Sequence, residues 1–157
     1  MPGQTEHPVT LVLRRAIEAE EGSYNLYTSA AQMVHTPNTR DLLRELAQEE
    51  LGHKRRLEDM LAGNPALVVA AGHERKITDL KIGDILVAQP LRPDADLQDV
   101  LIVASKREKA SYDFYTAMAE LTCGAEERKL FLFLAEEELG HKHRIESLYE
   151  QTVYQDF

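Results

Sequence analysis

The sequence Glu50-Leu51-Gly52-His53 occurs a second time as Glu138-Leu139-Gly140-His141, 88 positions later (138 − 50 = 88). The same offset pairs Glu20 with Glu108, and no gap is needed between the pairs. Residues i and i+3 of a helix lie on one face, so each copy presents a glutamate and a histidine together. Two such pairs and two further glutamates supply six oxygen and nitrogen ligands, which is the set that a dinuclear metal site requires.

Apolar residues at spacings of three and four predict four helices. Pro8 and Pro37 stand where helices begin, Gly63-Asn64-Pro65 ends the second helix, and Asp96 caps the third, with Asp99 at the capping-box position. The turns within the first and second pairs of helices are short, so each pair should form an antiparallel hairpin. The expected ranges are about 9–34, 37–62, 97–122 and 125–150.

The segment 63–96 between the hairpins differs in kind, because it holds three of the six prolines and an alternating apolar stretch around 67–69. A short helix could form over 76–87, where the periodicity is indecisive. So long a connection is uncommon inside a compact domain, and we interpret it as a crossover along the bundle. Two duplicated antiparallel hairpins joined by one long crossover predict an all-α, ferritin-like four-helix bundle, with residues 1–157 as a single domain.

The composition narrows the classes of function. The formal net charge of −9 argues against a nucleic-acid partner, which needs a basic face. The single cysteine excludes an internal disulfide and any cysteine-rich metal module. No signal pattern begins the sequence, and its longest apolar run, 66–71, is too short to cross a bilayer. We therefore expect a cytoplasmic protein that has neither a membrane nor a nucleic acid as partner.

One Glu-x-x-His on a helix is usually a solvated acid beside a base. Here the motif recurs at a fixed offset, and all six residues replace apolar residues in the stripes expected to face the core. A buried carboxylate must pair, become neutral or bind a metal. The nearby cations, at positions 54, 56, 142 and 144, lie at other angles around their helices. The sequence therefore predicts six metal ligands: Glu20, Glu50, His53, Glu108, Glu138 and His141.

Four carboxylates and two neutral imidazoles balance two divalent cations, which would change the net charge from −9 to −5 (−9 + 4 = −5). A carboxylate-rich set with one imidazole per metal suits iron or manganese. Structural zinc usually takes thiolates or more histidines, although zinc could occupy the site as a substitute. We therefore predict two iron ions, with manganese or zinc as substitutes.

The order Glu, Glu-x-x-His, crossover, Glu, Glu-x-x-His resembles the di-iron proteins of the rubrerythrin and ferritin-like superfamily. The similarity covers about residues 9–150, and the stretch 106–115 looks particularly like rubrerythrin-like proteins without the rubredoxin tail. The resemblance implies a role for each ligand: bridging carboxylates Glu50 and Glu138, terminal carboxylates Glu20 and Glu108, and one histidine per metal, His53 and His141.

The sequence departs from several relatives at informative positions. Rubrerythrins proper have a cysteine-rich iron domain and a second carboxylate one turn after the third-helix glutamate, where this chain has Ser111. The six-ligand set is closer to that of bacterioferritin, but Leu51 stands where bacterioferritins keep a haem-ligating methionine. Seven residues follow position 150, too few for the fifth helix of cage-forming ferritins. We expect a small di-iron bundle that is neither a storage cage nor a haem protein.

Several other side chains could have either a structural or a functional role. Tyr27 and Tyr115 follow Glu20 and Glu108 by seven residues, so each is either a core tyrosine or a hydroxyl that bonds a ligand carboxylate and serves the redox chemistry. Related proteins often use an acid before the bridging glutamate to hold the ligand histidine, which here would be Glu49 and Glu137. The plain alternative for these two acids is a solvated surface. The tyrosines at 24 and 112 are expected to pack, and the histidines at 7, 35, 73 and 143 show no partner pattern.

Similarity to rubrerythrins implies an oxidoreductase that reduces hydrogen peroxide or dioxygen with electrons from an external donor, such as a rubredoxin-like protein. The first alternative is an iron-binding or ferroxidase protein without a dedicated substrate. The second is a structural bundle that the metal only holds together. The sequence leaves the donor and the oligomeric state open, with a homodimer among the expected forms.

Overall fold

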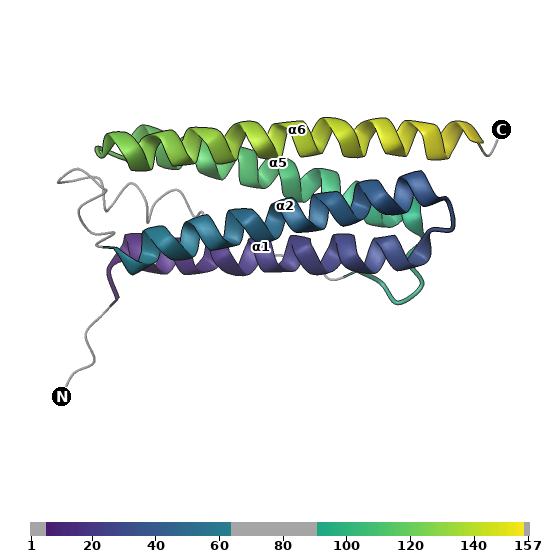
Figure 1. The fold of residues 1–157 in the computed structure, drawn as a ribbon, viewed down its shortest axis with the longest axis horizontal. Helices are drawn as coiled ribbons and strands as arrows, with labels where there is room; N and C mark the ends of the chain where they lie inside the picture. The colour runs from purple at the N-terminus through teal and green to yellow at the C-terminus, as the bar shows by residue number, and fades with distance from the viewer. Residues whose placement is uncertain (1–5, 64–90, 156–157) are drawn as a thin grey trace.

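The computed structural model describes residues 6–63 and 91–155, and within these ranges it contains four helices and no strand. Figure 1 shows the helices side by side along the long axis of the molecule, with α1 and α6 running in one direction and α2 and α5 in the other. The prediction of an all-α, ferritin-like four-helix bundle is confirmed. Most of the predicted crossover over 63–96, including the segment 76–87, lies outside the described residues. The helices are α1 (Pro8–Met33), α2 (Pro37–Ala62), α5 (Leu97–Leu121) and α6 (Ala125–Gln155).

Local sequence explains where the helices begin. The side chain of His7 caps α1 by accepting a hydrogen bond from the backbone nitrogen of Val9, at 3.2 Å. Asp96 and Asp99 form the expected capping box at the start of α5, each accepting a hydrogen bond from the other's backbone N–H. Thr36 occupies the N-cap position of α2 without a side-chain hydrogen bond, so Pro37 is the main start signal there.

Helix α6 runs to Gln155, five residues beyond the expected end at 150 (155 − 150 = 5). The extension is physically reasonable because residues 151–155 contain neither glycine nor proline to end a helix. Within it, the hydroxyl of Thr152 donates to the carbonyl of Leu148 at 2.8 Å. None of the four described helices is apolar over a length that could cross a membrane.

The buried apolar side chains form two clusters. One contains Leu13, Leu57 and Phe131, and the other contains Leu43 and Ile145. On every helix, the buried glutamate or Glu–His pair lies between the residues of the first cluster and those of the second. The two clusters therefore close the bundle on both sides of a central polar layer and keep water away from it.

A close approach between the hairpins occurs at Gly22. The guanidinium of Arg107 donates to the carbonyl of Ala19 at 2.7 Å and to the hydroxyl of Ser23 at 3.1 Å. A Cβ at Gly22 would lie 2.7 Å from the Arg107 Nη2. The glycine thus makes room for a side chain that joins α5 to α1 beside the polar layer.

The core assignment can be tested by one substitution at two positions. Leu57 is fully buried, whereas Leu132 on α6 is 46% exposed. Leu57→Ala should lower the free energy of unfolding of the metal-free protein by about 2–5 kcal/mol, because it removes buried methyl groups and leaves a cavity. Leu132→Ala should change it by no more than about 0.5 kcal/mol. Urea denaturation measures both, and equal losses at the two positions would contradict the described core.

Candidate metal centre

The polar layer brings together all six side chains predicted as ligands. Glu20 comes from α1 and Glu108 from α5, while α2 and α6 each contribute one glutamate and the histidine one turn later. No member of this set exposes more than 4% of its surface. Each residue occupies a core-facing position of its helix, so the duplicated sequence alone accounts for their convergence. The set consists of Glu20, Glu50, His53, Glu108, Glu138 and His141.

The two repeats contact each other reciprocally. The Nδ1 atom of His53 lies 2.7 Å from a carboxylate oxygen of Glu138, and the Nδ1 atom of His141 lies 2.7 Å from one of Glu50. The imidazole rings are stacked, with their centroids 5.4 Å apart and their planes 13° from parallel. Each histidine therefore turns its Nδ1 atom toward the glutamate of the other repeat, and carboxylate oxygens surround both nitrogens.

The donor atoms fall into two groups that share two residues. One group is Glu20, Glu50, His53 and Glu138; the other is Glu50, Glu108, Glu138 and His141. Within each group, one ligand atom per residue lies within 4.8 Å of all the others. A third group joins both histidines to the half-buried Glu137, so it reuses residues of the first two groups. Two adjacent cation positions with Glu50 and Glu138 between them fit this arrangement.

Hydrogen bonding gives an independent test of whether a cation fits. Among the described residues, seven buried side-chain nitrogen or oxygen atoms make no hydrogen bond of acceptable geometry, and all seven belong to the predicted ligands. Five of them lie only 2.7–2.9 Å from an atom of opposite charge, in the contacts between the imidazoles and the carboxylates. Buried polar atoms are otherwise almost always satisfied, so such a concentration calls for an explanation. Four carboxylates and two imidazoles are also the ligand chemistry that iron and manganese accept. The residues present fit a pair of divalent cations.

The two tyrosines predicted near the site bond its carboxylates across the bundle. The hydroxyl of Tyr27 donates to Oε1 of Glu108, and that of Tyr115 donates to Oε1 of Glu20. The other oxygen of each carboxylate, Oε2, has no hydrogen-bond partner among the described residues. The free Oε2 of Glu20 lies 3.6 Å from the Nδ1 atom of His53, whereas it is the tyrosine-bonded Oε1 of Glu108 that lies 3.6 Å from the Nδ1 atom of His141. Tyr24 packs against the core from a half-buried position, as expected.

Burial and mutual repulsion govern the charges of this layer. Burial raises the pKa of Glu50 and of Glu138 well above the ordinary range, and the charges of Glu108 and Glu20 raise both further. For Glu108, burial also acts upward, but the contacts with Glu138, His141 and Tyr27 lower its pKa overall. Without a cation, these shifts favour the protonated forms of Glu50 and Glu138.

The imidazole and the phenols of the layer are shifted too. Burial alone would lower the pKa of His141, but the carboxylates of Glu108 and Glu50 outweigh it and raise the pKa to about 11. Burial raises the pKa of Tyr27 and Tyr115, and the neighbouring glutamates raise it further. At neutral pH the imidazole of His141 is therefore protonated when no metal is bound, and the phenols stay neutral hydrogen-bond donors.

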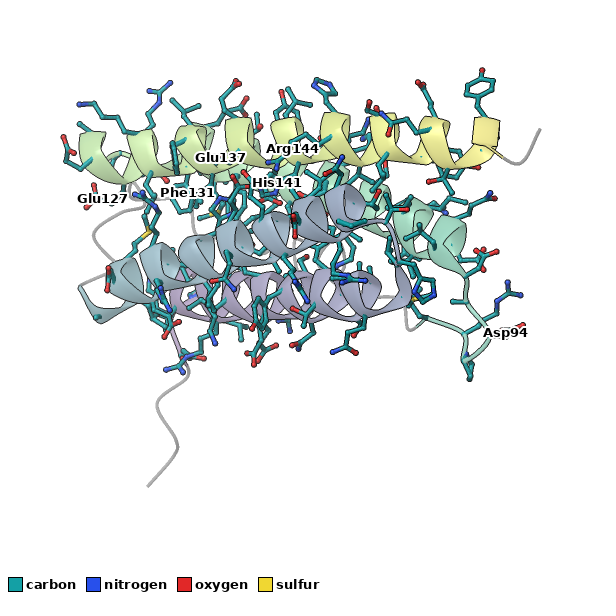
Figure 2. All side chains as sticks on the ribbon, turned by 45° about the vertical axis from the view of Figure 1, so that its right-hand side comes forward. Asp94, Glu127, Phe131, Glu137, His141 and Arg144 are labelled. Carbon is teal, nitrogen blue, oxygen red and sulfur yellow. The ribbon has the colours of Figure 1, made fainter. Side chains whose placement is uncertain are left out.

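Glu49, one of the two acids proposed to hold a ligand histidine, lies beside His141, and sequence reasoning missed the cation that lies beside Glu49, which is Arg144. The Nε2 atom of His141 is 2.9 Å from the carboxylate of Glu49, which accepts a hydrogen bond from Nη1 of Arg144 at 2.9 Å. Figure 2 shows His141, Glu137 and Arg144 on α6, where this helix faces α2. Arg144 was placed away from the ligands, and it reaches the site only through Glu49. Its position three residues after His141, one turn along the same face, was the available signal.

Comparison with known proteins supports the fold and shows the family. No curated protein matches the sequence. A hypothetical protein from Pyrococcus furiosus is 23% identical with a TM-score of 0.73, over 94% of this chain and 91% of that one. A proposed ferritin-like diiron-carboxylate protein from Thermotoga maritima is 17% identical with a TM-score of 0.70, over 92% and 95%. The sequence profile of the Rubrerythrin family matches residues 12–149, and the chain belongs to this family.

Proposed function

We propose that this protein is a di-iron carboxylate oxidoreductase that reduces hydrogen peroxide or dioxygen with electrons from an external donor. The observation that carries the proposal is the pair of buried donor groups that share Glu50 and Glu138. In a two-metal site, two ions lie about 3.5–4 Å apart and act together on one bound oxygen species. A shared pair of carboxylates is the ligand arrangement that brings two ions this close.

Each predicted ligand has a part in this proposal. Glu50 and Glu138 bridge, because each belongs to both donor groups. Glu20 and Glu108 are terminal, because a tyrosine hydroxyl already holds one oxygen of each. The histidines each serve one ion. We propose iron as the native metal, with manganese or zinc as substitutes.

Bound iron(II) would supply the two electrons that, with two protons, convert one hydrogen peroxide to two waters. The protein's own residues prepare the site for this chemistry. The apolar clusters on both sides exclude water, which strengthens every electrostatic interaction inside. Because the metal-free layer holds protons on His141 and the bridging glutamates, metal binding must displace them. Metal affinity should therefore weaken as the pH falls.

The electrons for repeated turnover should come from a carrier outside residues 1–157. The only cysteine of this sequence is Cys123, and rubredoxin-type iron requires four thiolates. No glycine-rich dinucleotide motif follows a strand in the sequence. A small, transient docking contact is typical of electron-transfer partners. We infer that a rubredoxin-like protein or a similar small carrier reduces the centre.

A stopped-flow experiment tests the function. Protein loaded with iron(II) and freed of reductant should consume about one peroxide per pair of irons and then stop. Reduced rubredoxin should restart the consumption, because two molecules, each giving one electron, return the two electrons that every cycle uses. Sustained turnover with NADH alone would contradict the external carrier. If peroxide has no effect while added iron(II) is oxidised far beyond two equivalents, the ferroxidase alternative replaces the proposal.

The tyrosines give a second test with matched controls. Tyr27→Phe removes the hydrogen bond to Glu108 and Tyr115→Phe removes the bond to Glu20. Each should weaken binding of one of the two cations by about tenfold or more, because a ligand that loses its supporting hydrogen bond is less well oriented. Tyr24→Phe and Tyr112→Phe, each three residues earlier on the same helix, should leave both affinities unchanged. Calorimetric titration with manganese(II) measures all four, and equal effects in the two pairs would rule out this role.

A further inference from the structure

The two halves of the metal centre have different surroundings, although the sequence duplicates them. On the His141 side, Arg144 contacts two acids of α2: its Nη1 is 2.9 Å from Glu49 and its Nη2 is 3.2 Å from Glu45. Glu49 in turn lies 2.9 Å from the Nε2 atom of His141. Arg144 and Glu49 are each about one third exposed, so the contact is only partly screened by water. An Arg–Glu–His chain thus reaches the centre from its edge.

The offset of 88 identifies the equivalent residues on the His53 side. Arg56 corresponds to Arg144 (144 − 88 = 56), and Glu137 corresponds to Glu49 (49 + 88 = 137). The equivalent of Glu45 is not an acid but Phe133 (45 + 88 = 133). The guanidinium of Arg56 lies over the ring of Phe133, 4.8 Å from its centroid. Among residues 6–63 and 91–155, no ion pair joins Glu137 to Arg56 or to His53.

We propose that Arg144 is a positioning residue that makes the two cation positions unequal. Through Glu49 it fixes the ring of His141, so that the position served by His141 binds a divalent cation more tightly than the position served by His53. A histidine that binds a metal through Nδ1 keeps its Nε2–H as a donor, and Glu49 is the acceptor within reach. The inference rests on the proposed metal centre and adds an order of loading to it.

The charge of Arg144 would act in the opposite direction, so the two effects must be separated. A positive guanidinium repels nearby cations, and its removal would raise the affinity of the centre. The two positions are adjacent, however, so this repulsion acts on both of them in the same direction. Loss of support for the His141 ring affects one position only. The ratio of the two binding constants therefore reports positioning, whereas their common change reports charge.

Calorimetric titration of the metal-free protein with Co²⁺ tests the proposal. The wild type should bind two ions with constants that differ by about tenfold or more, the effect typical of outer hydrogen-bond partners of a ligand. In Arg144→Gln the ratio of the two binding constants should fall toward one, mainly because binding at the tighter position weakens. Arg56→Gln is the matched control, and it should leave the ratio within about twofold of the wild type because Arg56 contacts no acid of the site.

Two further measurements keep the test decisive if Arg144→Gln is unstable. Phe133→Glu places an acid at the equivalent of Glu45, and should draw Arg56 toward Glu137 and tighten the weaker constant. Proton NMR of the wild type with one equivalent of Co²⁺ should show one shifted, exchangeable imidazole N–H. That signal should exchange faster with water in Glu49→Gln.

The outcomes separate the two proposals. Two Co²⁺ ions with equal constants in the wild type would overturn the inference alone, as would an unchanged ratio in a folded Arg144→Gln or an unchanged weaker constant in Phe133→Glu. An equal loss of ratio in Arg56→Gln would also overturn it. Failure of the wild type to bind two ions would overturn the proposed metal centre itself, and the inference with it.

Discussion

The structure depends on the burial of four carboxylates and two imidazoles in the middle of a helical bundle. A buried charge without compensation is costly, and burial and the neighbouring carboxylates raise the pKa of Glu50 and Glu138, which favours their neutral forms when no metal is bound. Seven polar atoms still make no hydrogen bond of acceptable geometry among the described residues. Replacing buried ionic groups by well-packed apolar residues is often neutral or stabilising, so stability alone gives no reason for this layer, whereas binding of a cation does.

The helices turn this costly layer into a defined site. Each carboxylate or imidazole is fixed by a rigid helix, and the apolar clusters on both sides hold the four helices in register. Tyr27 and Tyr115 join the hairpins by bonding the glutamate of the opposite one. Arg107 adds a link between α5 and α1. The same contacts that close the bundle therefore orient the donor atoms.

The periodicity and the duplication of the sequence predicted the bundle and most of the site, because both patterns depend only on positions within single helices. The bundle and the meeting of the six polar side chains required only that each stripe face a common core. The contacts of Tyr27 with Glu108 and of Arg144 with Glu49 depend on how two hairpins or two helices dock, which a stripe does not specify. The end of α6 was missed because no residue there signals a stop. Phe133 stands at the position equivalent to Glu45, as the sequence alone shows. Only the structure shows the consequence, because there the guanidinium of Arg56 lies over the ring of Phe133 rather than against an acid.

We propose above that Glu50 and Glu138 bridge two metal ions. Anomalous diffraction at the iron absorption edge, from crystals grown anaerobically with iron(II), tests it most directly. We expect two peaks per chain, about 3.5–4 Å apart and both between these carboxylates. One peak should lie beside His53 and the other beside His141. A single peak, or two peaks that share neither Glu50 nor Glu138, would contradict the proposal.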